Sequence, residues 1–318
     1  MNTKAFKADL LLLLTSMLWG FAFVAQKAGM DFIGPFTFNG LRFLLGSVSL
    51  LPVVLFMDRR NKTDAGTPET GDSHWPAPSQ SEKTKKTIAF FWGSLLVGSA
   101  LFIGASLQQV GMIYTTAGKG GFVTSLYVVL VPLVGIFFRR KTGFPSWIGA
   151  VLAFAGMYLL SAPRRLEAIN PGDLLVIASA LFWAFHVLLV DKFSKLFDPI
   201  KLSSAQFAWC ALFSLLTAII KEPISLGAMG GAIVPILYGG LASVGIAYTL
   251  QVIAQREAPP AHAAIIMSLE GVFAVLGGIL LLRERLSLSG AIGSALMLTG
   301  MFATQWDVLG FRRKKSTT

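Results

Sequence analysis

The sequence predicts an all-α integral membrane protein with ten transmembrane helices arranged as two inverted five-helix repeats. Three observations support this fold class: few charged residues, ten apolar segments of spanning length, and an internal repeat. Of the 318 residues, 54% are hydrophobic and only 14% are charged, and the mean hydropathy is +0.67. Because soluble domains carry about 25% charged residues, most of the surface of this chain must face lipid.

A membrane-spanning helix needs about 20 mainly apolar residues. Ten such segments occur, at residues 8–27, 36–56, 87–108, 117–138, 145–162, 172–191, 201–220, 232–254, 261–282 and 287–306. The first follows Lys4 and Lys7 but lacks a convincing small-residue cleavage site. We therefore expect it to be a retained helix and not a signal peptide.

The connections between these segments are short except for residues 58–86. Prolines, scattered small polar residues and charges of both signs, without apolar periodicity, predict a flexible cytoplasmic loop there. His74 and Trp75 lie in it, and an unstructured insert is a better interpretation of them than a partner-binding patch. Residues 307–318 are expected to form a basic cytoplasmic tail.

The distribution of lysine and arginine predicts the orientation. With a cytoplasmic N-terminus, 19 of the 27 basic residues fall in inner segments and seven in outer segments, while Arg42 lies within a span. The positive-inside rule therefore places both termini in the cytoplasm. Membrane topology explains the net charge of +11, so no nucleic-acid partner is expected.

The second half of the chain repeats the first. Aligned residues lie 164 positions apart before the long loop and 143 after it, as in the pairs Asp9/Asp173, Trp19/Trp183, Gln108/Gln251 and Ser125/Ser268. The repeats are predicted at residues 8–162 and 172–306. Since each holds five spans, an odd number, the two copies should cross the bilayer in opposite directions, as in many secondary transporters.

Several short motifs fall at defined places on these spans: Leu18-Trp19-Gly20-Phe21, Leu41-Arg42-Phe43-Leu44-Leu45, Thr115-Thr116-Ala117, Val131-Pro132-Leu133, Ser268-Leu269-Glu270-Gly271-Val272-Phe273-Ala274 and Leu282-Arg283-Glu284-Arg285-Leu286. Because it carries these motifs in this order, the chain resembles the drug/metabolite transporter (DMT) superfamily, specifically its ten-helix transporters with two EamA domains. The resemblance covers nearly the whole chain outside 58–86 and the basic tail. Two positions depart from it: Gly271 replaces a frequent proline, and Lys141 replaces the glutamate that would match Glu284.

The resemblance implies a secondary transporter of the cell inner membrane that exports small metabolites, amino-acid-like compounds or drugs by alternating access. An importer or a facilitative carrier is an alternative hypothesis, and a passive channel is another. An intramembrane lipid-modifying enzyme is the alternative from another class. The sequence lacks G-x-S-x-G, H-E-x-x-H, paired carboxylates and an ATP-binding glycine-rich loop, so we do not expect an enzyme.

Three ionisable residues within the spans are the first candidates for function, because such groups are costly in lipid. Arg42 is interpreted as a counter-charge for substrate or as a structural cation at a helix junction. Glu270 could couple protons or bind substrate, with an interhelical hydrogen bond as an equal alternative. His186 could carry a proton, although a satisfied buried histidine is the more common case.

Polar and aromatic residues on neighbouring helix faces complete the candidate site. Trp19 and Gln26 share one face of the first helix, and Trp183 and His186 occupy the matching face of the sixth, so we expect both faces to meet across a central cavity. Further candidates, which could bind a polar substrate or join helices, are the repeat mates Gln108 and Gln251 and, beside the latter, Tyr248.

Metal and cofactor sites are not expected. Cys210 is the single cysteine, and the three histidines, His74, His186 and His262, are far apart. Glu284 is expected to cap the ninth span or to join a gating ion pair. The expected partners are a small-molecule substrate and the lipid bilayer, and the sequence is compatible with proton coupling and with a homodimer.

Overall fold

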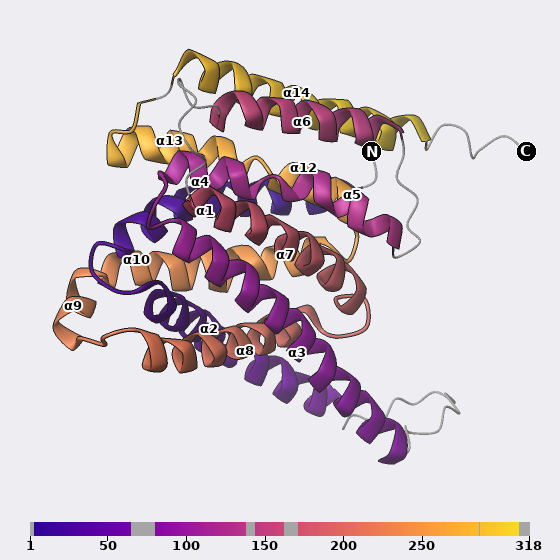
Figure 1. The fold of residues 1–318 in the computed structure, drawn as a ribbon. Coiled ribbons are helices and arrows are strands. Elements are labelled where there is room, and N and C mark those ends of the chain that lie inside the picture. Colours follow the sequence, from indigo (N-terminus) through magenta and orange to yellow (C-terminus); the bar gives the residue numbers. More distant parts are fainter. Residues whose placement is uncertain (1–2, 65–79, 138–143, 162–170, 286, 312–318) are drawn as a thin grey trace, which may run out of the picture.

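The computed structural model describes residues 3–64, 80–137, 144–161, 171–285 and 287–311. These residues form a bundle of helices with no strand among them (Figure 1). His74 and Trp75, like most of the basic tail, lie outside the described residues.

The helices of the first half are α1 (Thr3–Gly29), α2 (Pro35–Asp64), α3 (Gln80–Gly111), α4 (Ala117–Thr124), α5 (Tyr127–Phe137) and α6 (Phe144–Ser161). Those of the second half are α7 (Pro171–Phe193), α8 (Pro199–Lys221), α9 (Leu226–Gly231), α10 (Ile233–Leu237), the π-helix η1 (Tyr238–Tyr248), α11 (Thr249–Ala254), α12 (Pro260–Met267), α13 (Glu270–Leu282) and α14 (Leu288–Phe311). Together, α10, η1 and α11 occupy the eighth predicted span.

Helices run past two of the predicted boundaries. Helix α2 continues to Asp64 and α3 already begins at Gln80, so both ends of the expected loop 58–86 are helical. Helix α14 likewise runs to Phe311, into the expected tail. Hydropathy marks where a helix leaves lipid, whereas a helix continues into water as long as its residues tolerate the conformation.

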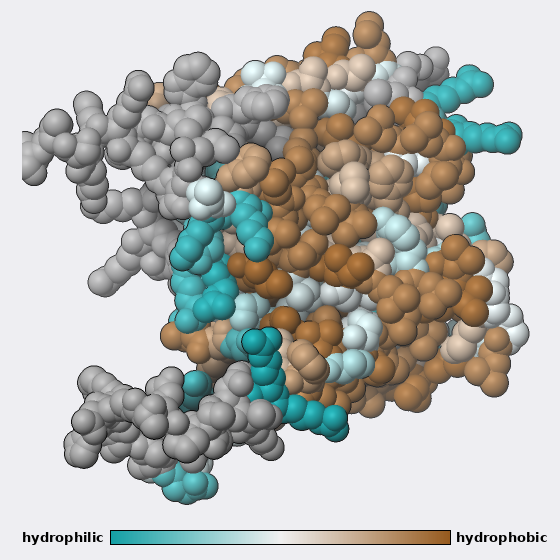
Figure 2. Space-filling view, turned by 180° about the vertical axis from the view of Figure 1, so that it is seen from behind, coloured by the Kyte–Doolittle hydropathy of each residue, from teal (hydrophilic) through white to brown (hydrophobic). Residues whose placement is uncertain are grey.

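Eight helical segments of the described residues are long and apolar enough to cross a membrane. The fifth and tenth predicted spans correspond to α6 and α14, in which shorter apolar stretches, Trp147–Gly156 and Leu288–Gly300, are found. Large apolar side chains lie on the outside of the bundle; Phe56 is 66% exposed, Ile220 76% and Leu280 71%. Figure 2 shows one such face, apolar between hydrophilic side chains at its two ends. A surface of this kind suits lipid contact.

Helices α2 and α8 pack along each other in opposite directions. The carboxylate of Asp58, near the end of α2, lies 2.5 Å from Lys201 Nζ near the start of α8. At the other end, Glu222 accepts hydrogen bonds from the backbone of Phe36 at 2.7 Å and of Thr37 at 2.8 Å. These contacts fasten both ends of the pair.

Helices α6 and α14 also pack antiparallel. A Cβ atom added at Gly156 would lie 2.4 Å from the carbonyl oxygen of Gly293, and one added at Gly300 would lie 2.6 Å from that of Gly149. The absence of side chains at these glycines allows the two backbones to approach closely.

Two spans are interrupted near their middle. Tight turns at Ser125 and Leu126 separate α4 from α5, and equivalent turns at Ser268 and Leu269 separate α12 from α13. Ser125 Oγ donates to the carbonyl oxygen of Ser268 at 3.1 Å. The two interruptions, at repeat-related positions, therefore touch each other in the centre of the bundle.

Helix α1 packs closely on α13 through Gly20. We expect Gly20→Ala to lower the thermal unfolding midpoint of the purified protein in detergent. The new methyl group would lie 2.2 Å from Phe273 Cβ and 2.8 Å from the carbonyl oxygen of Glu270. Such overpacking costs about 1–3 kcal/mol. Gly230→Ala is the control, because no atom lies within 4 Å of a Cβ there. Equal midpoints for the two variants would contradict the close packing.

Candidate functional site

One cavity lies where the two interrupted spans meet α1, α3, α7 and η1. Its lining residues are Trp19, Phe23, Gln26, Arg42, Gln108, Thr124, Tyr127, Trp183, His186, Val187, Ser243, Tyr248, Gln251, Met267 and Glu270. All nine residues singled out from the sequence are among them. The free space is about 30 Å³, which holds about two water molecules and is too small for a metabolite.

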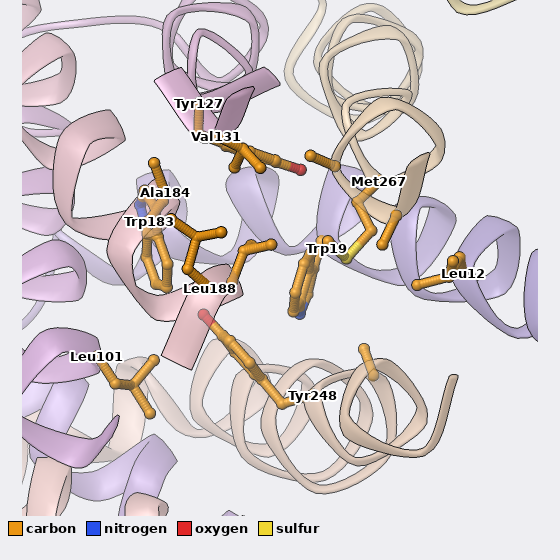
Figure 3. Packing of buried hydrophobic residues seen from close by; sticks show 14 of the residues in the cluster. Leu12, Trp19, Leu101, Tyr127, Val131, Trp183, Ala184, Leu188, Tyr248 and Met267 are labelled. Carbon is orange, nitrogen blue, oxygen red and sulfur yellow. The ribbon is translucent and has the colours of Figure 1, made fainter. Parts of the chain in front are cut away.

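Aromatic rings from three helices form one wall of the cavity. Tyr248 lies between the two repeat-related tryptophans, with its ring centroid 4.5 Å from that of Trp19 and 6.1 Å from that of Trp183. The same ring is 6.0 Å from His186. Figure 3 shows the side chains of Trp19, Trp183 and Tyr248 reaching into one space from separate helices. This wall can contact apolar or cationic parts of a ligand.

A chain of hydrogen bonds connects α1, α3 and α7 across the cavity. Gln108 Nε2 donates to Gln26 Oε1 at 2.8 Å, and Gln108 Oε1 accepts from Trp183 Nε1 at 2.8 Å. Thr124 Oγ1 lies 3.4 Å from the same oxygen of Gln108. Gln108 thus holds the side chains of Gln26 and Trp183 in place, which is the interhelical alternative considered from the sequence.

The π-helix η1 supplies backbone acceptors to α1. Trp19 Nε1 donates to the carbonyl oxygen of Ser243 at 3.2 Å, and Thr15 Oγ1 donates to that of Ala247 at 3.2 Å. π-helical turns are rare and are frequently found at functional sites. Its last residue is Tyr248, so this irregular segment positions the central ring of the aromatic wall.

Arg42 is the largest fully buried side chain of the described residues, with 2% exposure. Its Nε donates to Asn39 Oδ1 at 3.0 Å, and its guanidinium carbon lies 4.9 Å from the ring centroid of Phe43. Among the described residues, no carboxylate forms an ion pair with it. A buried cation without an acidic partner is costly and can attract an anionic group of a ligand.

His186 is joined to Gln206, which is the repeat mate of Arg42. His186 Nε2 and Gln206 Oε1 are 2.8 Å apart. Because a carbonyl oxygen only accepts hydrogen bonds, this contact places the ring proton on Nε2. Nδ1 of His186, which is buried, then remains an acceptor without a partner within the described part of the chain.

Tyr127 and Glu270 are repeat mates, and each begins the second half of an interrupted span. Tyr127 is the first residue of α5 and Glu270 the first of α13. The Tyr127 and Glu270 side chains are buried and interact with each other. Within the described residues, however, the Tyr127 hydroxyl, Glu270 Oε1 and Gln251 Oε1 make no hydrogen bond of normal distance and angle. Buried polar atoms are nearly always paired in folded proteins. These atoms therefore mark positions where a ligand or water can bind.

Some lining residues were not selected from the sequence. Tyr127 could have been selected as the repeat mate of Glu270. Ser243 could not, because it contributes a backbone carbonyl, and side-chain patterns do not predict the position of a backbone group. Phe23, Val187 and Met267 resemble ordinary core residues. The described residues contain no group of three metal-ligating side chains.

Glu284 contributes to two helix ends. Its backbone N–H donates to the carbonyl oxygen of Gly278 at 2.9 Å, so it helps to cap the ninth span, as expected, next to Arg283 with its left-handed φ of 56°. Its carboxylate also accepts hydrogen bonds from the backbone of Ala117 at 2.9 Å and of Gly118 at 3.1 Å. Glu284 therefore caps α4, where the N-terminal amides favour negative charge.

Comparison with known proteins points to one family. The pattern of the EamA-like transporter family matches residues 6–162 and again residues 170–305. An uncharacterized transporter of Archaeoglobus fulgidus is 30% identical over 307 residues, which is 93% of this chain and 85% of that protein. The uncharacterized transporter YoaV of Bacillus subtilis is 24% identical, with 94% of this chain and 96% of that protein covered.

More distant likenesses agree. A WAT1-related protein of Arabidopsis thaliana is 21% identical over 263 residues, covering 70% of each chain. A solved crystal structure superposes with a TM-score of 0.71 over 97% of this chain and 99% of the other, at 19% identity. This last likeness concerns the fold alone. Two family matches and a relative aligned over nearly the full length show that the chain is a member of the EamA-like transporter family.

Proposed function

We propose that this membrane protein is a secondary transporter that exports a small polar metabolite through the central cavity by alternating access. The observation that carries the proposal is the cavity itself. Arg42, His186 and Glu270, the ionisable residues predicted within the spans, all line it. His186 and Glu270 each keep a buried polar atom that makes no regular hydrogen bond to any described residue. Such groups in a membrane protein are functional candidates by default.

Ten spans in two inverted repeats are part of the proposal. Its support is the antiparallel packing of two pairs of repeat mates, α2 with α8 and α6 with α14. If the two repeats crossed the membrane in the same direction, repeat-related helices that pack on each other would run parallel. Discontinuous helices that meet at the bilayer midplane are a feature of transporters with inverted repeats.

The arrangement of charge suggests the kind of substrate. Arg42 can bind an anionic group, and Glu270 or the rings of Trp19, Trp183 and Tyr248 can contact a cationic or polar group. A small molecule that carries both kinds of group, such as an amino-acid-like compound, fits this chemistry. Because the cavity holds only about two waters, helices must separate to admit it.

Repeat-related contacts between an aspartate and a basic side chain lie at the two ends of the bundle. Near the start of α1, Asp9 Oδ1 lies 2.7 Å from His262 Nε2 in α12. Near the start of α7, its mate Asp173 lies 2.5 Å from Lys119 Nζ in α4, and Lys119 is the mate of His262. Helices α1 and α7 run in opposite directions in Figure 1, so the two pairs lie at opposite ends. We take them as the gates that open in turn.

The positive-inside rule supports an inner-membrane location with both termini in the cytoplasm. The first residues of α1 and the last residues of α14 lie at the same end of the bundle (Figure 1), as this orientation requires. The Asp9–His262 gate would then face the cytoplasm and the Asp173–Lys119 gate the outside.

We expect Glu270→Gln to remove the stimulation of efflux by a pH gradient in proteoliposomes, while exchange of substrate across the membrane continues. The amide cannot take up and release a proton, but it retains the size and polarity of the carboxyl group. The substrate is first chosen from a metabolite panel as the compound that most stabilises the wild-type protein against heat. Glu257→Gln, at an exposed acid outside the cavity, is the control. Unchanged gradient-driven efflux in Glu270→Gln would refute the coupling role.

Arg42→Gln is expected to weaken binding of that metabolite about 10- to 100-fold, since a hydrogen bond to a charged group contributes about 1.5–3 kcal/mol. Binding is measured by isothermal titration calorimetry with two compounds. One is the metabolite, and the other is its derivative in which an uncharged amide replaces the carboxylate. The amide should bind wild-type protein and Arg42→Gln alike. If the variant loses affinity for both compounds equally, Arg42 acts as a structural cation and the counter-charge role is wrong.

The two gates are expected to bias the carrier in opposite directions. In a Cys210→Ala background, Thr124→Cys places a thiol in the cavity, and a membrane-impermeant maleimide is applied from either side. Asp9→Asn should speed labelling several-fold from the N-terminal side, because it removes the carboxylate that contacts His262. Asp173→Asn removes the carboxylate that pairs with Lys119 and should speed labelling from the opposite side.

Asp31→Asn, at an exposed acid outside both gates, is the matched control and should leave labelling unchanged. Faster labelling from the same side in both gate variants would be inconsistent with two alternating gates.

A further inference from the structure

A second hollow lies on the outer surface of the bundle, between α3 and α7. It measures about 560 Å³, and its walls are apolar apart from Ser99 and, at one end, Lys192. Its lining residues are Leu96, Ser99, Ala100, Ile103, Phe182, Phe185, Leu188, Leu189 and Lys192. Leu96 is 50% exposed and Ile103 37%, so this groove is open toward the surface that faces lipid.

The groove exists because small side chains form its floor. Ser99 and Ala100 lie between the larger Leu96 and Ile103 on α3, and Phe182 and Phe185 rise on the side of α7. Along α7 the lining runs from Phe182 to Lys192, ten residues or about 15 Å of helix. This length is about half of the 30 Å hydrocarbon thickness of a bilayer. The groove is therefore about as long as one leaflet is thick.

A cation stands at the end of the groove. Lys192 is exposed near the end of α7, with its Nζ 5.4 Å from the ring centroid of Phe193. Among the described residues, no carboxylate forms an ion pair with it. By contrast, its neighbour Lys195 is bound to Asp191 at 2.7 Å. The charge of Lys192 is thus available to an anionic group.

We propose that this groove binds an acyl chain of an anionic phospholipid whose phosphate pairs with Lys192. The apolar part of the groove matches an acyl chain in length. The cation at its end lies where the phosphate of the headgroup would follow the chain. With the proposed orientation, this end lies in the cytoplasmic leaflet, where anionic lipids attract basic side chains. The site is separate from the central cavity, because Phe182 and Phe185 face the groove while Trp183 and His186 of the same helix line the cavity.

The test is lipid retention, measured by native mass spectrometry on the full-length protein purified in detergent. Phosphatidylglycerol and phosphatidylcholine with identical acyl chains are added in turn, and inorganic phosphate is added in a third sample. The wild-type protein should retain one phosphatidylglycerol in preference to phosphatidylcholine. Phosphate alone should not compete at equal concentration, because it lacks the chain that fills the groove.

Two variants separate the headgroup from the chain. Lys192→Gln should lower phosphatidylglycerol retention about fivefold, to the level of phosphatidylcholine, since a lysine near an anionic surface contributes about 1 kcal/mol. Ser99→Leu fills the floor of the groove and should lower retention of both lipids. The matched controls are Lys86→Gln, at an exposed lysine near the start of α3, and Ala295→Leu, at an exposed position on α14.

Equal retention of both lipids by the wild-type protein would overturn the proposal, as would equal losses in Lys192→Gln and Lys86→Gln. None of these readouts requires transport activity, so the lipid site and the proposed function stand or fall separately.

Discussion

The hydrogen bond from Ser125 to the carbonyl oxygen of Ser268 joins the two interrupted spans at the centre of the molecule. In lipid, every backbone polar group must be satisfied within the protein, so irregular backbone is tolerated only where protein or a polar cavity surrounds it. The turns after α4 and α12 meet this condition by lying against each other. Because Tyr127 and Glu270 directly follow these turns, the turns place both side chains at the cavity.

The two halves are related in position but not in charge. Arg42 corresponds to Gln206 and Glu270 to Tyr127, so each charged residue of the cavity has an uncharged mate. A symmetric framework thus carries an asymmetric site, with a cation and an acid contributed by different halves. At the ends of the bundle the relation is different, because Asp9 and Asp173 are both retained while their partners are a histidine and a lysine. Symmetry is kept where the bundle closes, and it is broken where a ligand would bind.

Much of the candidate site could be predicted from the sequence, because helix periodicity and the repeat both act on side chains. Trp19 and Trp183 were placed on facing stripes, and both line the cavity. The π-helix η1 could not be predicted, since a change from i+4 to i+5 hydrogen bonding leaves no mark in hydropathy. The contact of Asp9 with His262, 253 residues away in the chain, depends on how the halves pack, which no local pattern encodes.

The central claim is that the two ends of the bundle open in turn around one cavity. The direct measurement is a pair of spin-label distances in nanodiscs, Lys7 to Glu257 at the Asp9 end and Ile113 to Pro171 at the Asp173 end. Alternating access predicts that conditions which lengthen one distance, such as addition of the stabilising metabolite, leave the other short. Lengthening of both distances under the same conditions would describe a pore and would contradict the account.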